Sequence, residues 1–165
     1  AKWAGISNYK ELVTDPLFWQ ALKVTSTFAL FSIPLQLIFA LTLAILLNQK
    51  IKGLPLFRLI YFMPVVTSGV AVALLWRWIF NPDFGVINLI LSNFGIQGPP
   101  WLASRAWALP ALIIMSLWTI GGTMIIFLAG LQGIPISLYE AATVDGANWW
   151  RKFWAVTIPI LSPVI

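Results

Sequence analysis

Residues 24–49 read VTSTFALFSIPLQLIFALTLAILLNQ, and none of these 26 side chains carries a charge. A helix that crosses the hydrocarbon core of a bilayer needs about 20 consecutive, mostly apolar residues. The stretch therefore predicts a membrane-spanning helix over residues 24–47. Asp15, followed by Pro16, predicts that this helix begins before the membrane, because aspartate caps helix starts and proline suits the first turn.

Polar residues precede this first span. Asn8 and Glu11 have the spacing of a capping box, in which two side chains satisfy the free N–H groups at a helix start. The spacing predicts a short surface helix ahead of Asp15.

Two further uncharged stretches, residues 59–76 and 106–139, follow along the chain. They predict spans over residues 59–80 and 107–131. A fourth span is expected over 153–165, cut short by the end of the sequence. Because the first residue is not methionine and the last stretch stops in an apolar pattern, we expect the sequence to be the middle of a longer protein.

The composition agrees with a membrane protein. Hydrophobic residues make up 60% of the chain and charged residues 9%, whereas a soluble domain carries about 25% charged residues. The absence of cysteine and histidine excludes disulfides, thiolate metal sites and histidine catalysis. Ten scattered basic residues form no stripe, so we expect no nucleic-acid partner. The predicted fold class is an all-α polytopic membrane helix bundle, with residues 1–165 forming one domain embedded in a lipid bilayer.

Residues 81–105 are expected to form an outer loop that contains a short amphipathic helix. Apolar side chains share one predicted face of this helix, with Asn88 and Ser92 on the opposite face. The apolar residues are Val86, Ile87, Ile90, Leu91 and Phe94. Arg77 and Arg105 flank the loop; either they contact an extracytoplasmic protein or they anchor the membrane ends of the spans.

Tryptophans are expected at the ends of the spans, where indole rings favour the headgroup region. Trp76 and Trp101 are predicted at one membrane face, and Trp149 and Trp150 at the other. Basic residues divide evenly between the two faces, but Lys50, Lys52 and Arg58 are crowded together, which favours the cytoplasm for the face that carries residues 132–152.

Residues 132–152 form a longer connection than two neighbouring spans require. Ser137 and Glu140 have capping-box spacing and predict a helix that starts at Ser137. The pair Asp145-Gly146 predicts a turn in which glycine adopts positive φ. A second helix is expected from Asn148. The connection therefore predicts a helix, a turn and a helix at the membrane face.

Ala141 and Ala142 are small enough to let another protein approach the first of these helices closely. The Glu140 carboxylate beside them is suited to pairing with an arginine of that protein. An ordinary interfacial loop that happens to contain alanines explains the same residues, and both interpretations remain open at this point.

Polar and small residues inside the spans are candidates for a substrate path. Trp118 needs a partner for its indole N–H in an apolar environment, and the glycines beside it expose backbone. The candidates are Trp118, Thr119, Gly121, Gly122 and Thr123 in the third span, Gln36 in the first, and Thr67 and Ser68 in the second. The alternative is that they pack against neighbouring helices.

The stretch EAATVDGANWWRKFWAVTIPILSP, residues 140–163, resembles the EAA loop of permease subunits from binding-protein-dependent ABC importers. The pattern falls on Glu140, Ala141, Ala142, Gly146 and Pro159; the leucine usual before the proline is replaced by Ile158. Four further stretches resemble carbohydrate-uptake permeases of the maltose and glycerol-phosphate type. They are GISNYKELVTDPLFWQALKVT, LFRLIYFMPVV, LLWRWIFNPDFGVINLIL and LAGLQGIPISLYEAA. The resemblance covers essentially the whole chain.

This resemblance implies a core of six helices, of which the four predicted spans are the second to fifth. It implies that residues 132–152 are cytoplasmic and carry a coupling helix that docks into an ATPase subunit. The docking residues would be Glu140, Ala141, Ala142, Asp145 and Gly146. The implied partners are a second permease subunit in a heterodimer, two ATPase subunits and an extracytoplasmic solute-binding protein. The implied location is the cytoplasmic membrane of a bacterium or archaeon.

The function predicted from the resemblance is ATP-driven import of a sugar or sugar-like solute by alternating access. ATP would be bound and hydrolysed on the partner ATPases, because this chain has no Walker glycine loop and is not expected to be an enzyme. A gradient-driven secondary transporter is the alternative, although no ionisable residue lies in the middle of a span, as a proton relay requires. A membrane scaffold without transport is a third possibility.

Overall fold

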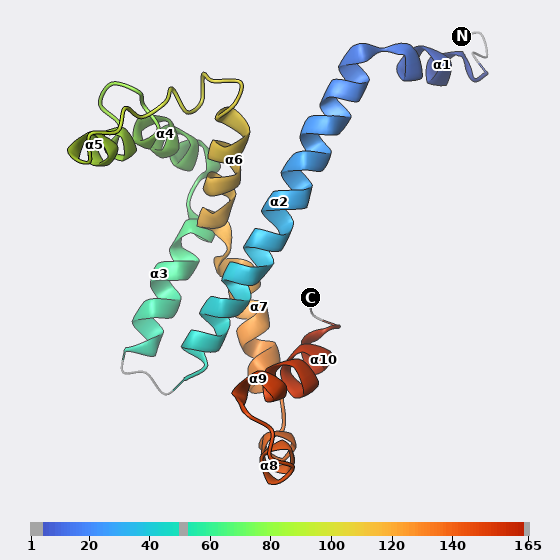
Figure 1. Cartoon of the computed structure of the whole chain (residues 1–165), viewed down its shortest axis with the longest axis vertical. Helices are drawn as coiled ribbons and strands as arrows, with labels where there is room; N and C mark the ends of the chain where they lie inside the picture. The colour runs from blue at the N-terminus through green and yellow to red at the C-terminus, as the bar shows by residue number, and fades with distance from the viewer. Residues whose placement is uncertain (1–4, 50–52, 164–165) are drawn as a thin grey trace.

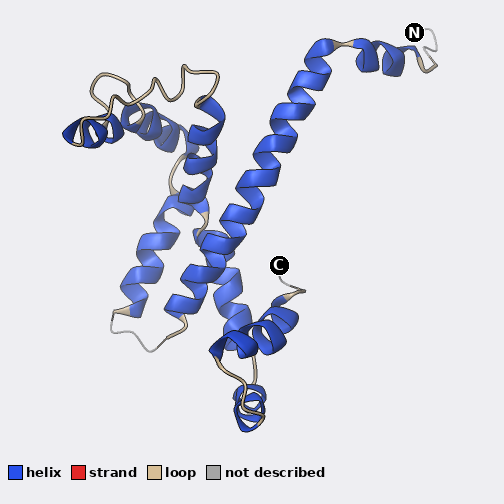
Figure 2. Cartoon of the chain, in the orientation of Figure 1, coloured by secondary structure: helices blue, strands red, loops and turns tan. Residues whose placement is uncertain are grey.

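The computed structural model describes residues 5–49 and 53–163, and these form helices joined by loops, without a strand among them (Figures 1 and 2). The predicted all-α helix bundle is therefore confirmed. Lys50, Lys52 and the last two residues of the predicted fourth span lie outside the described residues.

Helix α1, Ser7–Thr14, precedes the long helix α2, Pro16–Leu47. The Asp15 carboxylate accepts the backbone N–H of Leu17 at 2.8 Å, so Asp15 caps α2 as predicted. The capping box predicted at Asn8 and Glu11 is wrong, because α1 already begins at Ser7 with Ile6 as its N-cap. The Lys10 N–H bonds the Ile6 carbonyl, so Asn8 lies inside the first turn instead of capping it.

The predicted second span, residues 59–80, is not one straight helix. Helices α3, Leu54–Val66, and α4, Gly69–Ile79, meet at 100°. Pro64 lacks an N–H and disturbs the helix, and Thr67 then takes up extended backbone with ψ of 141°. The Thr67 hydroxyl donates to the carbonyl of Met63 at 2.9 Å, which satisfies an acceptor near the end of α3.

The predicted third span is also bent. Helix α6, Ala108–Ser116, continues through a 3₁₀ turn, Leu117–Thr119, into α7, Gly121–Gln132, and the two parts meet at 48°. Among the described residues, α2 alone is long and apolar enough to cross a membrane as one helix. The number rises to three if each bent pair counts as one span.

Helix α5, Val86–Asn93, lies within the predicted outer loop, but its orientation differs from the prediction. Asn88 is buried, whereas Ile90 and Phe94 are exposed. The Asn88 side chain accepts the indole N–H of Trp101 at 2.7 Å and donates to the carbonyl of Pro82 at 3.0 Å. Asn88 therefore turns inward because it has polar partners there, which compensate for its burial.

The main core lies where α2 crosses α7 (Figure 1). Ala40 and Ala44 of α2 are fully buried against a cluster that includes Met124, Phe127 and Leu128 of α7. Lipid tails are as apolar as these side chains, so close van der Waals packing rather than expulsion of water drives helix association in a membrane. The two alanines permit that close approach.

A second cluster lies at the end of the bundle that α4, α5 and the loop after α5 form. Trp76 is buried and stacks on Phe80 with ring centroids 5.1 Å apart, and Trp101 packs on the other side of Phe80. Ile87 and Leu91 of α5 pack against this cluster. That Trp76 and Trp101 lie at headgroup level stays a prediction, because burial within the protein does not fix depth in a membrane. Arg77 and Arg105 are exposed.

Candidate functional site

Helix α8, Ile136–Val144, lies beyond the end of α7 and is seen end-on in Figure 1, across the direction of α7. Its start differs from the prediction by one residue. Pro135 is the N-cap, and the backbone N–H of Leu138 bonds the Pro135 carbonyl at 3.1 Å. Ser137 therefore lies inside the first turn, where it does not form the predicted capping box with Glu140.

The end of α8 agrees with the sequence prediction. Gly146 has φ of +72°, and the backbone N–H groups of Gly146 and Ala147 bond the carbonyls of Thr143 and Ala142. These two bonds form a Schellman cap, in which the left-handed residue is usually glycine. The next helix, α9, Trp149–Lys152, begins where predicted, because the Asn148 side chain caps it by accepting the backbone N–H of Arg151 at 2.9 Å.

The five predicted coupling residues are all accessible on α8 and the turn after it. Glu140, Ala141, Asp145 and Gly146 are exposed, and Ala142 is half-buried. No residue of α8 is buried, and Val144 is 88% exposed. A nine-residue helix without a fully buried side chain gains little stability from packing, although Tyr139 is partly buried against the main core cluster. Its conformation is held by its caps and by a few contacts to the next helix.

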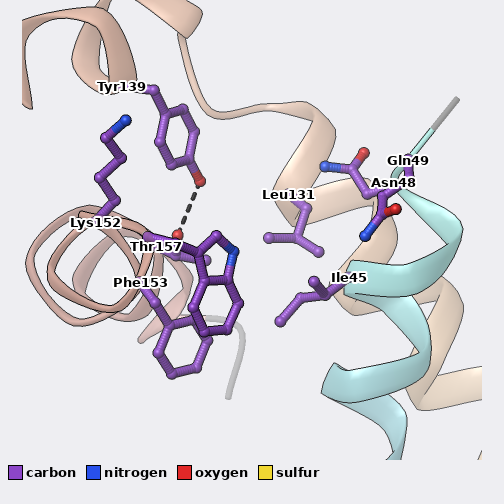
Figure 3. A pocket seen from close by; sticks show the side chains of 9 residues that line it. Ile45, Asn48, Gln49, Leu131, Tyr139, Lys152, Phe153 and Thr157 are labelled. Carbon is purple, nitrogen blue, oxygen red and sulfur yellow. Dashed lines mark hydrogen bonds between the residues drawn. The ribbon is translucent and has the colours of Figure 1, made fainter. Parts of the chain in front are cut away.

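Two side-chain hydrogen bonds connect α8 to the helix that follows it. The hydroxyls of Tyr139 and Thr157 are 2.9 Å apart, and the Lys152 ammonium donates to the Thr143 hydroxyl at 2.7 Å. Tyr139 and Thr157 also line a cavity of about 220 Å³ that reaches to the end of α2, where Ile45 lies opposite Leu131 of α7 (Figure 3).

The structure brings two of the predicted path residues together. Trp118 and Thr67 line one apolar cavity of about 310 Å³ in the angle between α3 and α4. Trp118 also packs edge-on against Trp76, with ring centroids 6.0 Å apart. Ser68 is exposed beside Thr67 at the bend.

The other candidates lie elsewhere. Thr119 faces a separate groove between α2 and α6. Gln36 is half-buried on the stripe of α2 that carries Ser32 and Ala40, four residues before and after it. Ala40 belongs to the core cluster with α7. Thr123 and Gly122 are half-buried. The structure therefore does not gather all eight candidates into one cavity.

Gly121 has a packing role. It is buried, and a Cβ atom at this position would overlap the carbonyl oxygen of Tyr61 in α3. At Gly122 a Cβ atom would meet nothing within 4 Å. Of the two adjacent glycines, only Gly121 is thus needed for the contact between α3 and α7.

Sequence reasoning missed Tyr139, Thr157 and Lys152 as the residues that join α8 to the next helix. The tyrosine and threonine hydroxyls meet across 18 residues, and they lie in separate helices joined by a turn, so no single helical pattern relates them. The one available signal was a tyrosine in a segment otherwise rich in small and apolar residues. Among residues 5–49 and 53–163, no group of three or more acidic, histidine or cysteine side chains is placed to hold a metal ion.

Comparison with known families matches residues 13–165 to the family described as binding-protein-dependent transport system inner membrane component. The chain is 48% identical to the probable ABC transporter permease protein YesP of Bacillus subtilis (strain 168), over 99% of this chain and 54% of that protein. It is 43% identical to the lactose transport system permease protein LacF of Rhizobium radiobacter, over 99% of this chain and 56% of that protein.

A solved structure is similar along nearly the whole chain. It is a bacterial ABC transporter involved in the import of the acidic polysaccharide alginate, with a TM-score of 0.85 and 29% identity. The match covers 98% of this chain and 57% of that one. The chain thus spans about half the length of the curated relatives it matches.

Proposed function

The chain belongs to the family of binding-protein-dependent transport system inner membrane components, and we propose that it is part of the membrane-spanning subunit of an ATP-driven importer. The observation that carries the proposal is α8, a short helix without buried residues that lies across the end of the bundle and exposes Glu140 and Ala141. An exposed helix of this kind is suited to docking on another protein.

In this proposal α8 is the coupling helix. It docks into a partner ATPase subunit, where the exposed Glu140 carboxylate pairs with a basic side chain. ATP is bound and hydrolysed on two such ATPase subunits, and this chain catalyses no reaction itself. Closure of the ATPase dimer moves α8, and the helix bundle changes between inward-open and outward-open states with different affinities for the solute.

The proposed solute is a sugar or sugar-like molecule. The name of one relative assigns it to lactose transport, and the similar solved structure imports alginate. Another structure with 29% identity and a TM-score of 0.85 is an alginate transporter in complex with a pentasaccharide-bound periplasmic protein. The periplasmic protein in that complex supports an extracytoplasmic solute-binding protein as a partner. The proposal further includes a second permease subunit in a heterodimer and a location in the cytoplasmic membrane of a bacterium or archaeon.

The experiment that tests the proposal is site-directed cross-linking in the full-length protein, cleared of cysteines and co-expressed with a candidate ATPase subunit. Ala141→Cys places a thiol on the exposed face of α8. Ser92→Cys, on exposed α5 at the other end of the bundle, is the matched control.

We expect Ala141→Cys to cross-link to the ATPase with a yield that changes on ATP addition, and to resist a membrane-impermeant maleimide added outside the cell. Ser92→Cys should show the reverse behaviour. Labelling of Ala141→Cys from outside, or the absence of any ATPase cross-link, would refute the coupling role and leave a gradient-driven transporter as the better explanation.

A further inference from the structure

Helix α8 has few ways to transmit a displacement to the bundle. Within the described residues, two side-chain hydrogen bonds join it to the following helix, Tyr139–Thr157 and Thr143–Lys152. The Lys152 side chain is long and flexible, and its bond to Thr143 is exposed. Such a contact between a mobile ammonium and a hydroxyl constrains position weakly, because the side chain loses entropy when it is held.

The Tyr139–Thr157 bond differs in rigidity and burial. The tyrosine ring has only two side-chain torsions, and it packs against the main core cluster. Thr157 is 6% exposed, and it is β-branched, which restricts its χ1 angle. When a buried hydroxyl loses its hydrogen-bond partner, the folded state is destabilised, because the hydroxyl stays removed from water without a bond that compensates for this. The bond therefore favours one fixed position of α8 against the next helix.

Thr157 also ends an unusual segment of backbone. Phe153–Thr157 form a π-helical turn between α9 and α10, Ile158–Leu161. Pro159 follows, and its missing N–H leaves the carbonyl of Ala155 without the partner that an α-helix provides. A π-turn widens the helix there, and such turns are often found at functional sites. Tyr139 thus contacts the next helix at the point where its backbone departs from regular α-helix.

From this geometry we propose that Tyr139 and Thr157 are positioning residues that make α8 and the segment Trp149–Leu161 move as one body. Displacement of α8 by the ATPase then reaches the membrane helix instead of being absorbed in the turn at Gly146. The inference rests on the proposed function, since it names the connection through which the coupling helix acts.

The test measures whether α8 stays fixed to the next helix when ATP acts. Spin labels at Val144→Cys and Ile160→Cys, both exposed, report their separation by electron paramagnetic resonance in the full-length transporter complex, with and without ATP and vanadate. With native Tyr139 and Thr157, we expect one narrow distance distribution that ATP does not change. Tyr139→Phe and Thr157→Val should each raise the population of a second distance about two- to tenfold in the ATP state, the range for one buried hydrogen bond.

Three further variants sharpen the result. The double variant should be no worse than either single variant, because both remove the same bond. Thr157→Ser keeps the hydroxyl and should retain the one narrow distance distribution of the native protein. Thr42→Val is the matched control, because the Thr42 hydroxyl bonds only the Ile38 carbonyl of its own helix among the contacts described.

The outcomes separate the two proposals. If the Ala141→Cys cross-link responds to ATP but Tyr139→Phe leaves the distance distribution unchanged, the positioning role is refuted and the proposed function stands. If the effects of the single variants multiply in the double variant, the two hydroxyls act separately and the role is again refuted. If the complex shows no ATP-dependent cross-link, the proposed function is refuted and the positioning role with it.

Discussion

Replacing Gly121 by alanine should separate helices α3 and α7. A Cβ atom at Gly121 would overlap the Tyr61 carbonyl oxygen and lie 3.2 Å from the Cα atom of Phe62. Both obstacles are backbone atoms, so no rotamer change relieves the overlap. The helices must move apart, and this loosens the contact that glycine permits in membrane proteins.

The magnitude follows from a matched pair of variants. Alanine favours helix over glycine by about 1 kcal/mol, and this gain is comparable for Gly121→Ala and Gly122→Ala. At Gly122 the added methyl meets nothing within 4 Å, so its remaining effect should be close to zero. The difference between the variants is then the cost of overpacking alone, about 1–3 kcal/mol, with Gly121→Ala the less stable.

The assay is unfolding of the full-length protein from lipid–detergent micelles by titrated sodium dodecyl sulfate, followed by tryptophan fluorescence. The free energy of unfolding should be lower for Gly121→Ala than for Gly122→Ala by the amount above. Equal free energies for the two variants would refute the packing role of Gly121. If Gly121→Ala impaired transport without changing the free energy of unfolding, Gly121 would instead be supported as a residue of the substrate path.

Three further changes test other parts of the structure. Asn88→Ala should lower the free energy of unfolding by about 1–3 kcal/mol, because the indole N–H of Trp101 loses its acceptor. Asn93→Ala at the exposed end of α5 is the control. An equal loss of stability in Asn93→Ala would contradict the buried role of Asn88. Glu140→Gln should leave the melting temperature unchanged and weaken ATPase binding roughly tenfold or more, the range for a charge-assisted hydrogen bond. Co-purification of the ATPase at graded salt concentrations measures this binding. Unaltered binding would rule out the pairing of Glu140 with a basic side chain. Gly146→Ala should destabilise the end of α8 by about 1–2 kcal/mol, because an L-residue resists positive φ, and hydrogen exchange at the Ala147 amide should then accelerate.

Local chemistry predicted the helix ends where the deciding residues are neighbours in the chain. Asp15 caps α2, Asn148 caps α9 and Gly146 closes α8 as expected, because each of these signals acts within one turn of backbone. Ser137 was misjudged because the preceding Pro135 already occupies the cap position.

Residues that act through partners distant in sequence were not predicted correctly. Asn88 lies on the inner side of α5 because Trp101 supplies a donor there, and Trp76 is buried where Trp118 packs edge-on against it.

The sequence by itself determined that this is an all-α membrane protein with a helix, turn and helix within residues 132–152, because charge-free length and short-range capping are properties of contiguous residues. The tertiary structure alone decided which of two adjacent glycines joins α3 to α7, and that Tyr139 meets Thr157. Such contacts depend on how helices cross, and many crossings satisfy the same hydrophobic pattern. Close packing of particular atoms selects one of them.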